Sequence, residues 1–88
     1  MKLKKDLVLR QVANTWVVLP VGSASVNFNG MITLNESGVL LWEALERGEN
    51  VCGMVSALTS EYAIDESTAM QDVNEFVAKL RSAGCLDD

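Results

Sequence analysis

Few side chains in this sequence of 88 residues could carry out covalent or metal chemistry, because it contains no histidine and only two cysteines. Cys52 and Cys85 are far apart and belong to no Cys-x-x-Cys motif. Two thiolates alone do not complete the tetrahedral shell of a zinc ion. We therefore expect no metal site and no cofactor, and we interpret both cysteines as buried thiols that act as small apolar residues.

Carboxylates are the remaining candidates for acid–base chemistry, and Glu61, Asp65 and Glu66 are close neighbours in the sequence. They fall where one predicted helix ends and the next begins, so we interpret them as solvated helix ends. No base is evident beside the serines and threonines, and no Gly-rich phosphate loop is present. The sequence therefore predicts that the protein is not an enzyme.

The charge distribution restricts the possible partners. The formal net charge is −5, from 12 acidic and 7 basic residues. We expect residues 1–6 to form a loose basic arm, since three of the basic residues lie there: Lys2, Lys4 and Lys5. Binding to a phosphate backbone requires clustered lysine and arginine. We therefore expect neither nucleic acid nor an anionic membrane surface as a partner.

The length of the chain predicts a single domain that spans residues 1–88. The first ten residues are charged and lack the apolar core of a secretory signal. No apolar run approaches the roughly 20 residues that a membrane-spanning helix needs. We therefore expect a soluble protein of the cytoplasm.

The first third of the sequence predicts β structure. Residues 7–12 and 15–19 have the β-branched, alternating character of strands, and Ala13-Asn14 makes a plausible turn between them. Asn29-Gly30 is a strong hairpin signal, because a type I′ turn needs positive φ at both central residues. It predicts a further hairpin of residues 25–28 and 31–34. The sheet therefore has three strands, or four if both arms of this hairpin pair within it.

The remainder of the sequence predicts three helices, each preceded by a residue whose side chain can accept from the free N–H groups of the first turn. The capping residues are Asn35, Asn50 and Asp65. The predicted helices cover about residues 36–46, 51–62 and 66–83, and Gly48 and Gly84 follow the first and the last of them. Strands followed by helices indicate an α+β domain, for which a winged-helix-like arrangement is the most economical packing.

The last predicted helix has a wide apolar stripe. At 100° per residue, its central line is formed by Ala69, Val73, Phe76 and Leu80. Met70 and Val77 widen the stripe on one flank, and Asn74 and Arg81 follow next around the helix. This flank is either part of a broad core face or one wall of a groove between the helix and the sheet. A groove that contains methionine suits an adaptable peptide-binding surface.

The predicted strand of Met31, Ile32, Thr33 and Leu34 is short, uncharged and free of proline. Natural proteins usually protect exposed strand edges with lysine, proline or bulges. An unprotected edge beside an apolar helical flank could accept an extra strand from another chain. The two elements together therefore predict binding of an extended peptide.

The order of these segments resembles the PqqD family. A strand ending in VVLP precedes NGMITLNESGVLLWEAL, and a last helix begins after YAIDESTA and ends in VAKLRSAGCL. The resemblance covers nearly the whole chain, from Leu7 to Leu86. It implies a winged-helix-like RiPP recognition element, a domain that binds the leader of a ribosomally made precursor peptide. Such domains present the leader to a modifying enzyme, often a radical SAM protein.

In the PqqD family the leader adds as a strand to the third strand and lies in a groove against the third helix. Carried onto this chain, the resemblance implies that the peptide contacts Met31, Ile32, Thr33 and Leu34 on the strand. On the helix it implies contacts with Met70, Asn74, Val77 and Arg81. The segment of residues 21–28 is more similar to relatives in other pathways than to the member that serves pyrroloquinoline quinone biosynthesis.

Two alternative functions remain open from the sequence. A winged-helix DNA-binding regulator would share the topology, although the last helix carries Glu66, Asp72 and Glu75 beside Lys79 and Arg81. A non-catalytic enzyme subunit would use the same strand edge without a peptide ligand. The edge could also pair with its counterpart in a second copy and form a homodimer.

Overall fold

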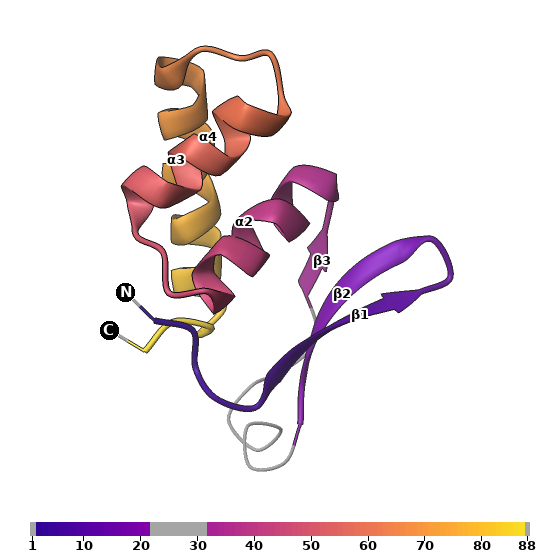
Figure 1. Cartoon of the computed structure of the whole chain (residues 1–88). Coiled ribbons are helices and arrows are strands. Elements are labelled where there is room, and N and C mark those ends of the chain that lie inside the picture. Colours follow the sequence, from indigo (N-terminus) through magenta and orange to yellow (C-terminus); the bar gives the residue numbers. More distant parts are fainter. Residues whose placement is uncertain (1, 22–31, 88) are drawn as a thin grey trace.

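The structure is a computed structural model of the whole chain, and it describes residues 2–21 and 32–87 (Figure 1). Three strands come first: β1 (Leu7–Val12), β2 (Thr15–Pro20) and β3 (Ile32–Leu34). Three helices follow: α2 (Glu36–Glu46), α3 (Val51–Glu61) and α4 (Glu66–Ser82). The α+β class and the order of strands before helices are confirmed. Of the hairpin expected over residues 25–28 and 31–34, residues 25–31 lie outside the described residues, and the return strand is described from Ile32 to Leu34.

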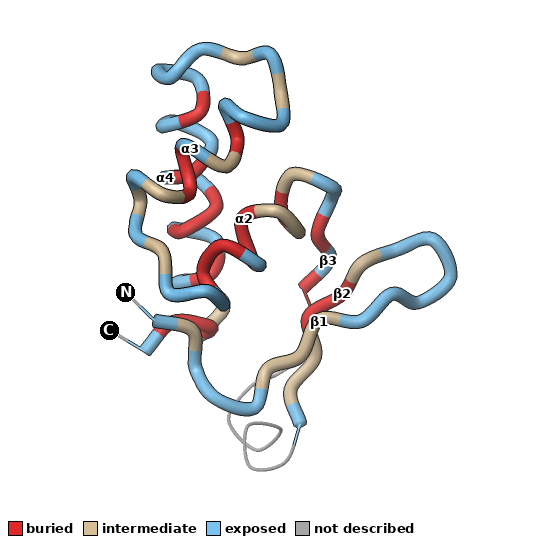
Figure 2. The backbone as a smooth tube through the Cα atoms, in the orientation of Figure 1, coloured by how far each residue is buried: buried red, intermediate tan, exposed pale blue. Residues whose placement is uncertain are grey.

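The sheet is antiparallel, with β2 in the centre and β1 and β3 on either side. In the β2–β3 register Val17 lies opposite Thr33, and Val18 lies opposite Ile32. The β1–β2 hairpin projects away from the helices (Figure 1). Its tip is exposed (Figure 2), and Val12 there retains 57% of its accessible surface. The described strands therefore form a small, twisted layer against one side of the helices.

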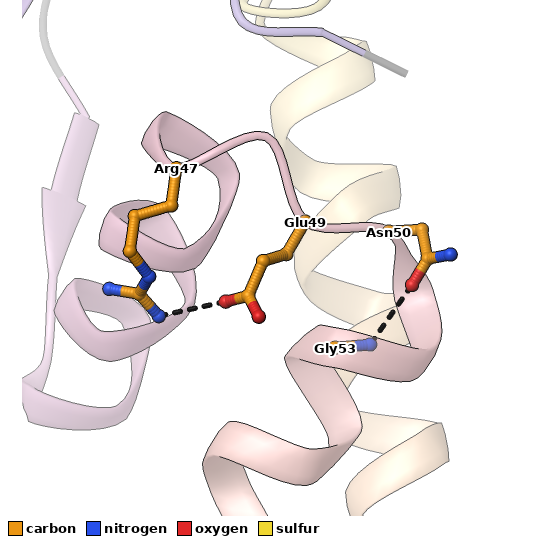
Figure 3. Close-up of polar contacts among 4 residues, drawn as sticks. All are labelled: Arg47, Glu49, Asn50 and Gly53. Atoms are coloured by element: carbon orange, nitrogen blue, oxygen red, sulfur yellow. Dashed lines mark hydrogen bonds and ion pairs between the residues drawn. The ribbon is translucent and has the colours of Figure 1, made fainter.

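Each helix begins as the sequence predicts, with a side chain that accepts a backbone hydrogen bond from the first turn. The Asn35 Oδ1–Gly38 N distance is 2.8 Å. Asn50 Oδ1 accepts from Gly53 N at 3.0 Å (Figure 3), and Asp65 Oδ1 accepts from Thr68 N at 2.7 Å. The Thr68 bond also lowers the pKa of the Asp65 carboxyl, since it favours the ionised form.

The connection from α2 to α3 is short and locally ordered. Gly48 has a φ of +84°, which ends α2 in a conformation that favours glycine. The Arg47 Nη2–Glu49 Oε2 ion pair measures 2.8 Å and is exposed (Figure 3), so it adds little stability. A Cβ at Gly53 would lie 2.9 Å from the Glu49 Cβ, so this position of α3 has to be small for the loop to cross the first turn.

The core lies where the three helices meet the sheet. Its most completely buried side chains come from all of these elements and from the C-terminal segment: Trp42, Met54, Leu58, Leu80, Val18, Val73 and Cys85. The predicted central line of α4 is confirmed, since Ala69, Val73, Phe76 and Leu80 are all buried. On β3, Ile32 and Leu34 also point into this core, whereas Thr33 between them is exposed.

The N-terminal segment differs from the loose arm that the sequence suggested. Leu3 forms a β-bridge with Leu86 near the end of the chain. Lys4 N donates to Cys85 O at 2.8 Å, and Asp87 N donates to Lys2 O at 2.8 Å. The two ends of the chain lie side by side (Figure 1). This pairing is non-local, so a charged N-terminal sequence gives no sign of it.

The two cysteines differ in environment, which corrects the expectation that both are buried. Both are free, but Cys52 is exposed on α3 whereas Cys85 is buried. Burial raises the pKa of the Cys85 thiol, an effect that the nearby positive charge of Lys4 partly opposes. Cys85 is therefore both inaccessible and poorly ionised at neutral pH.

We expect iodoacetamide at pH 7.5 to alkylate Cys52 of the native protein readily and Cys85 hardly at all, because the thiolate is the reactive form. Mass spectrometry should find one adduct on the native protein and two after unfolding in urea. Equal labelling of both cysteines in the folded protein would contradict the buried position of Cys85.

The β1–β2 turn contains a strained residue. Ala13 has a φ of +56°, in a region that residues with a side chain seldom adopt. Replacing Ala13 by Gly should remove a strain of about 1–2 kcal/mol and cost part of that in chain entropy. We therefore expect Ala13→Gly to raise the free energy of unfolding by about 0.5–1 kcal/mol.

Urea unfolding followed by circular dichroism will measure this gain. Asn14→Gly is the matched control, since Asn14 is not among the residues with positive φ. The control should give no gain in stability. A stabilised Asn14→Gly together with an unchanged Ala13→Gly would show that the turn has a different conformation.

Candidate peptide-binding site

The edge of β3 that faces away from β2 is open among the described residues, because β3 is the last strand of the sheet. The Thr33 carbonyl accepts a hydrogen bond from Lys79 Nζ of α4 at 3.1 Å, so it faces away from β2. In an antiparallel pair, the N–H and C=O of one residue point to the same side of the strand. Thr33 therefore presents both a donor and an acceptor at this edge.

A groove runs between the β3 edge and α4. One part has a volume of about 390 Å³ and is lined by Thr33, Leu34, Asn35, Gly38, Phe76 and Lys79. The adjoining part, of about 320 Å³, is lined by Asn35, Ser37, Gly38, Leu41, Asp72, Glu75, Phe76 and Lys79. Because the two parts share four lining residues, we treat them as one feature, the β3–α4 groove.

Local structure fixes the walls of the β3–α4 groove. Asn35 alone separates β3 from α2, so the strand edge passes directly into the first turn of a helix. A Cβ at Gly38 would lie 3.3 Å from the Leu34 Cβ, which means that glycine allows α2 to start this close to the strand. The opposite wall comes from Asp72, Phe76 and Lys79, which are separated by about one turn and therefore share a face of α4.

The predicted strand residues have distinct positions in the structure. Ile32 and Leu34 are buried in the core, with 8% and 7% exposure, so their side chains anchor the strand rather than face a peptide. Thr33 lies at the open edge with its side chain exposed. Met31 lies outside the described residues.

The predicted helix residues lie away from the strand. Met70 lines a separate recess between α3 and α4, of about 190 Å³, together with Cys52, Val55, Ser56, Thr59 and Glu66. Val77 is buried, whereas Asn74 and Arg81 are exposed. These three lie on the same side of α4 as Met70, at spacings of four, seven and eleven residues. The structure therefore brings Phe76 and Lys79, rather than Met70, to the β3 edge.

The sequence projection missed the side chains that line this wall: Asp72, Glu75, Phe76 and Lys79. Phe76 belongs to the predicted core line, and the sequence predicts no binding role for Asp72, Glu75 and Lys79. The projection identifies both flanks of a helix, but it does not show which flank a distant strand approaches. The spacing of Asp72, Glu75 and Lys79 beside a buried aromatic residue was the available signal.

The described residues hold no group of three or more potential metal ligands among histidine, cysteine, aspartate and glutamate. None of the helices in the described part of the chain is both long and apolar enough to cross a membrane. The feature that stands out is thus a strand edge with a groove beside it.

The fold and the groove define a small α+β domain in which a three-stranded antiparallel sheet ends in an open strand beside the last helix. The family model described as "Coenzyme PQQ synthesis protein D (PqqD)" matches residues 15–86. The chain belongs to the PqqD family. The comparison with curated proteins found no match.

Two solved structures are similar to this chain. One is described as TbiB1 in complex with the TbiA(beta) leader peptide; it has a TM-score of 0.80 and 24% identity, over 99% of this chain and 95% of that one. The other is a lasso peptide synthetase B1 complexed with the leader peptide, with a TM-score of 0.76 and 24% identity, over 96% and 93%. At this identity the likeness shows that the fold is shared.

Alternate burial along β3 predicts different responses to mutation. Leu34→Ala should lower the free energy of unfolding by about 2–4 kcal/mol, because it leaves a cavity in the core. Thr33→Val should change it by less than about 0.5 kcal/mol, because the side chain is exposed. Urea unfolding of both variants measures the difference. Comparable losses at the two positions would show that the strand has a different register.

Proposed function

We propose that this protein binds the leader of a ribosomally synthesised precursor peptide as an extra strand on β3 and presents it to a modifying enzyme. The observation that carries the proposal is the outward-facing N–H and C=O of Thr33 beside the β3–α4 groove. Backbone pairing with the edge gives affinity, and the groove receives alternate side chains of the peptide.

The comparisons support this proposal in two ways. The chain belongs to the PqqD family, and the sequence resemblance to that family implies a peptide-recognition domain rather than a catalyst. Both similar structures are described as complexes with leader peptides, and each is matched over nearly its full length. Family membership also favours peptide binding over the DNA-binding alternative.

The described edge offers two backbone groups, the N–H and the C=O of Thr33, and each new hydrogen bond would contribute roughly 0.5–1.5 kcal/mol. Two buried peptide side chains would add about 1.5–3 kcal/mol each. Most of the favourable binding free energy would therefore come from the side chains that the groove buries.

The remaining parts of the proposal concern partners and location. A radical SAM protein is the modifying enzyme that the family resemblance favours, and the present chain acts in the cytoplasm as a non-catalytic partner. A homodimer through the β3 edge would compete with the peptide for the same hydrogen bonds. Peptide contacts with the Met70 flank, including Asn74, Val77 and Arg81, remain a prediction that the binding experiment below tests.

Thr33→Pro should weaken leader binding at least tenfold, because proline removes the N–H that faces the open edge. It should spare the β2–β3 ladder, since that N–H points away from β2. The probe is a fluorescein-labelled candidate leader, chosen from the short reading frames near this gene, and fluorescence anisotropy gives the dissociation constant. Thr33→Val is the matched control and should bind like the wild-type protein.

Met70→Ser tests the other flank of α4 in the same assay, and its affinity should be unchanged if the peptide lies in the β3–α4 groove. Circular dichroism must show that each variant is folded. Unchanged binding by folded Thr33→Pro would overturn the assignment of the strand edge. A loss in Met70→Ser alone would move the site to the flank that the sequence predicted.

A further inference from the structure

We propose that the β3–α4 groove selects peptides by the order of their charges, with an acidic side chain against Lys79 and a basic side chain against Asp72 and Glu75. An apolar side chain lies over Phe76 between them. This inference rests on the proposed function and specifies the peptide that the site accepts. The charge order also fixes the direction in which the peptide enters the groove.

The end of the groove near Thr33 is positive. Lys79 is the charged residue that lines the first part of the groove, and its ammonium group bonds the Thr33 carbonyl. A peptide N–H that donates to the Thr33 carbonyl replaces Lys79 as its hydrogen-bond donor. The Lys79 ammonium then needs a new acceptor, and a carboxylate on the adjacent peptide residue supplies one.

The other end of the groove carries the acidic residues. Lys79 lines both parts of the groove, whereas Asp72 and Glu75 line only the second part, next to the start of α2. Glu75 Oε1 accepts from Gln71 Nε2 at 3.4 Å, a long bond that leaves the carboxylate most of its capacity to accept. Both carboxylates belong to exposed residues of α4. A lysine or arginine of the peptide is the side chain that complements this end.

The spacing of these groups matches an extended chain. With a rise of about 1.5 Å per residue, Phe76 lies about 4.5 Å along α4 from Lys79, and Asp72 lies about 6 Å further. Alternate residues of a strand are about 6.6 Å apart and point to the same face. Three alternate peptide residues can therefore lie over Lys79, Phe76 and the acidic end in turn.

The direction of the peptide follows from this arrangement. The Lys79 ammonium lies beside Thr33, and the acidic end lies beside Ser37 and Leu41 of α2, so the two ends are fixed relative to β3. A peptide that enters the wrong way places like charges together at both ends. Such juxtaposition suppresses wrong partners more than it strengthens the right one.

A charge exchange within the protein tests this proposal. Asp72→Asn, Glu75→Lys and Lys79→Glu together invert the order of the charges along the groove and change the net charge by one unit only, so general electrostatic attraction stays nearly the same. Wild-type and exchanged proteins are each used to select from a phage-displayed library of random 12-residue peptides. Peptides selected by the wild type should carry an acidic residue two to four positions from a basic one, in a single order along the chain.

The exchanged protein should select the opposite order. One selected peptide is then synthesised in its original form and with its acidic and basic residues exchanged. The original should bind the wild type at least about fivefold more tightly, and the preference should reverse with the exchanged protein. Selected peptides without charge order, or with the same order for both proteins, would overturn the inference.

Thr33→Pro separates this inference from the proposed function. If the selected peptides fail to bind Thr33→Pro but show no charge order, the strand-edge function is supported and the charge rule is wrong. If the selected peptides bind Thr33→Pro as tightly as the wild type, both the proposed function and the charge rule are wrong. The same conclusion follows if no peptide is enriched from the library. Circular dichroism of the exchanged protein checks that α4 remains folded.

Discussion

The constraint on which the site depends is that the outward backbone groups of β3 lack a strand partner among the described residues. Backbone N–H and C=O groups are strong hydrogen-bonding groups, and an edge that leaves them open invites another chain. β3 has only three residues, and Asn35 ends it by starting α2. Because Ile32 and Leu34 anchor the strand in the core, Thr33 is held with its backbone facing outward. The same packing that folds the domain thus presents an open strand edge.

Lys79 gives the open edge of β3 some protection against pairing with a second copy. Its bond to the Thr33 carbonyl places a charge at the edge, which is a common way to discourage pairing between copies. An exposed bond of this kind contributes little net stability, about 0–1 kcal/mol. A peptide strand that pairs with the edge can therefore displace the bond from Lys79 to the Thr33 carbonyl. A peptide that forms only one transient contact cannot. Lys79 therefore both protects the edge and offers an ion-pair partner to a carboxylate of the bound peptide.

The sequence predicted the features that depend on nearby residues. The caps at Asn35, Asn50 and Asp65 and the exit glycines are local, so their residue types identify them directly. The docking of Leu3 on Leu86 and the flank of α4 that meets β3 are non-local and were missed. Cys52 shows a different error, because the helical spacing of Met54, Val55 and Leu58 already places it off the buried face. The expectation that Cys52 is buried rests on its residue type, whereas the helical periodicity places it at the surface.

The fold by itself does not separate peptide binding from DNA binding, because a sheet followed by three helices serves both. The last helix decides between them. A helix that reads DNA presents basic and amide side chains to phosphates and base edges, whereas α4 turns Asp72 and Glu75 toward its groove. Two carboxylates at one end would repel a phosphate backbone, yet they suit a peptide whose charges alternate in sign. In the proposed function, the charges that α4 places along the strand edge at positions 72, 75 and 79 would therefore decide which peptide the edge accepts.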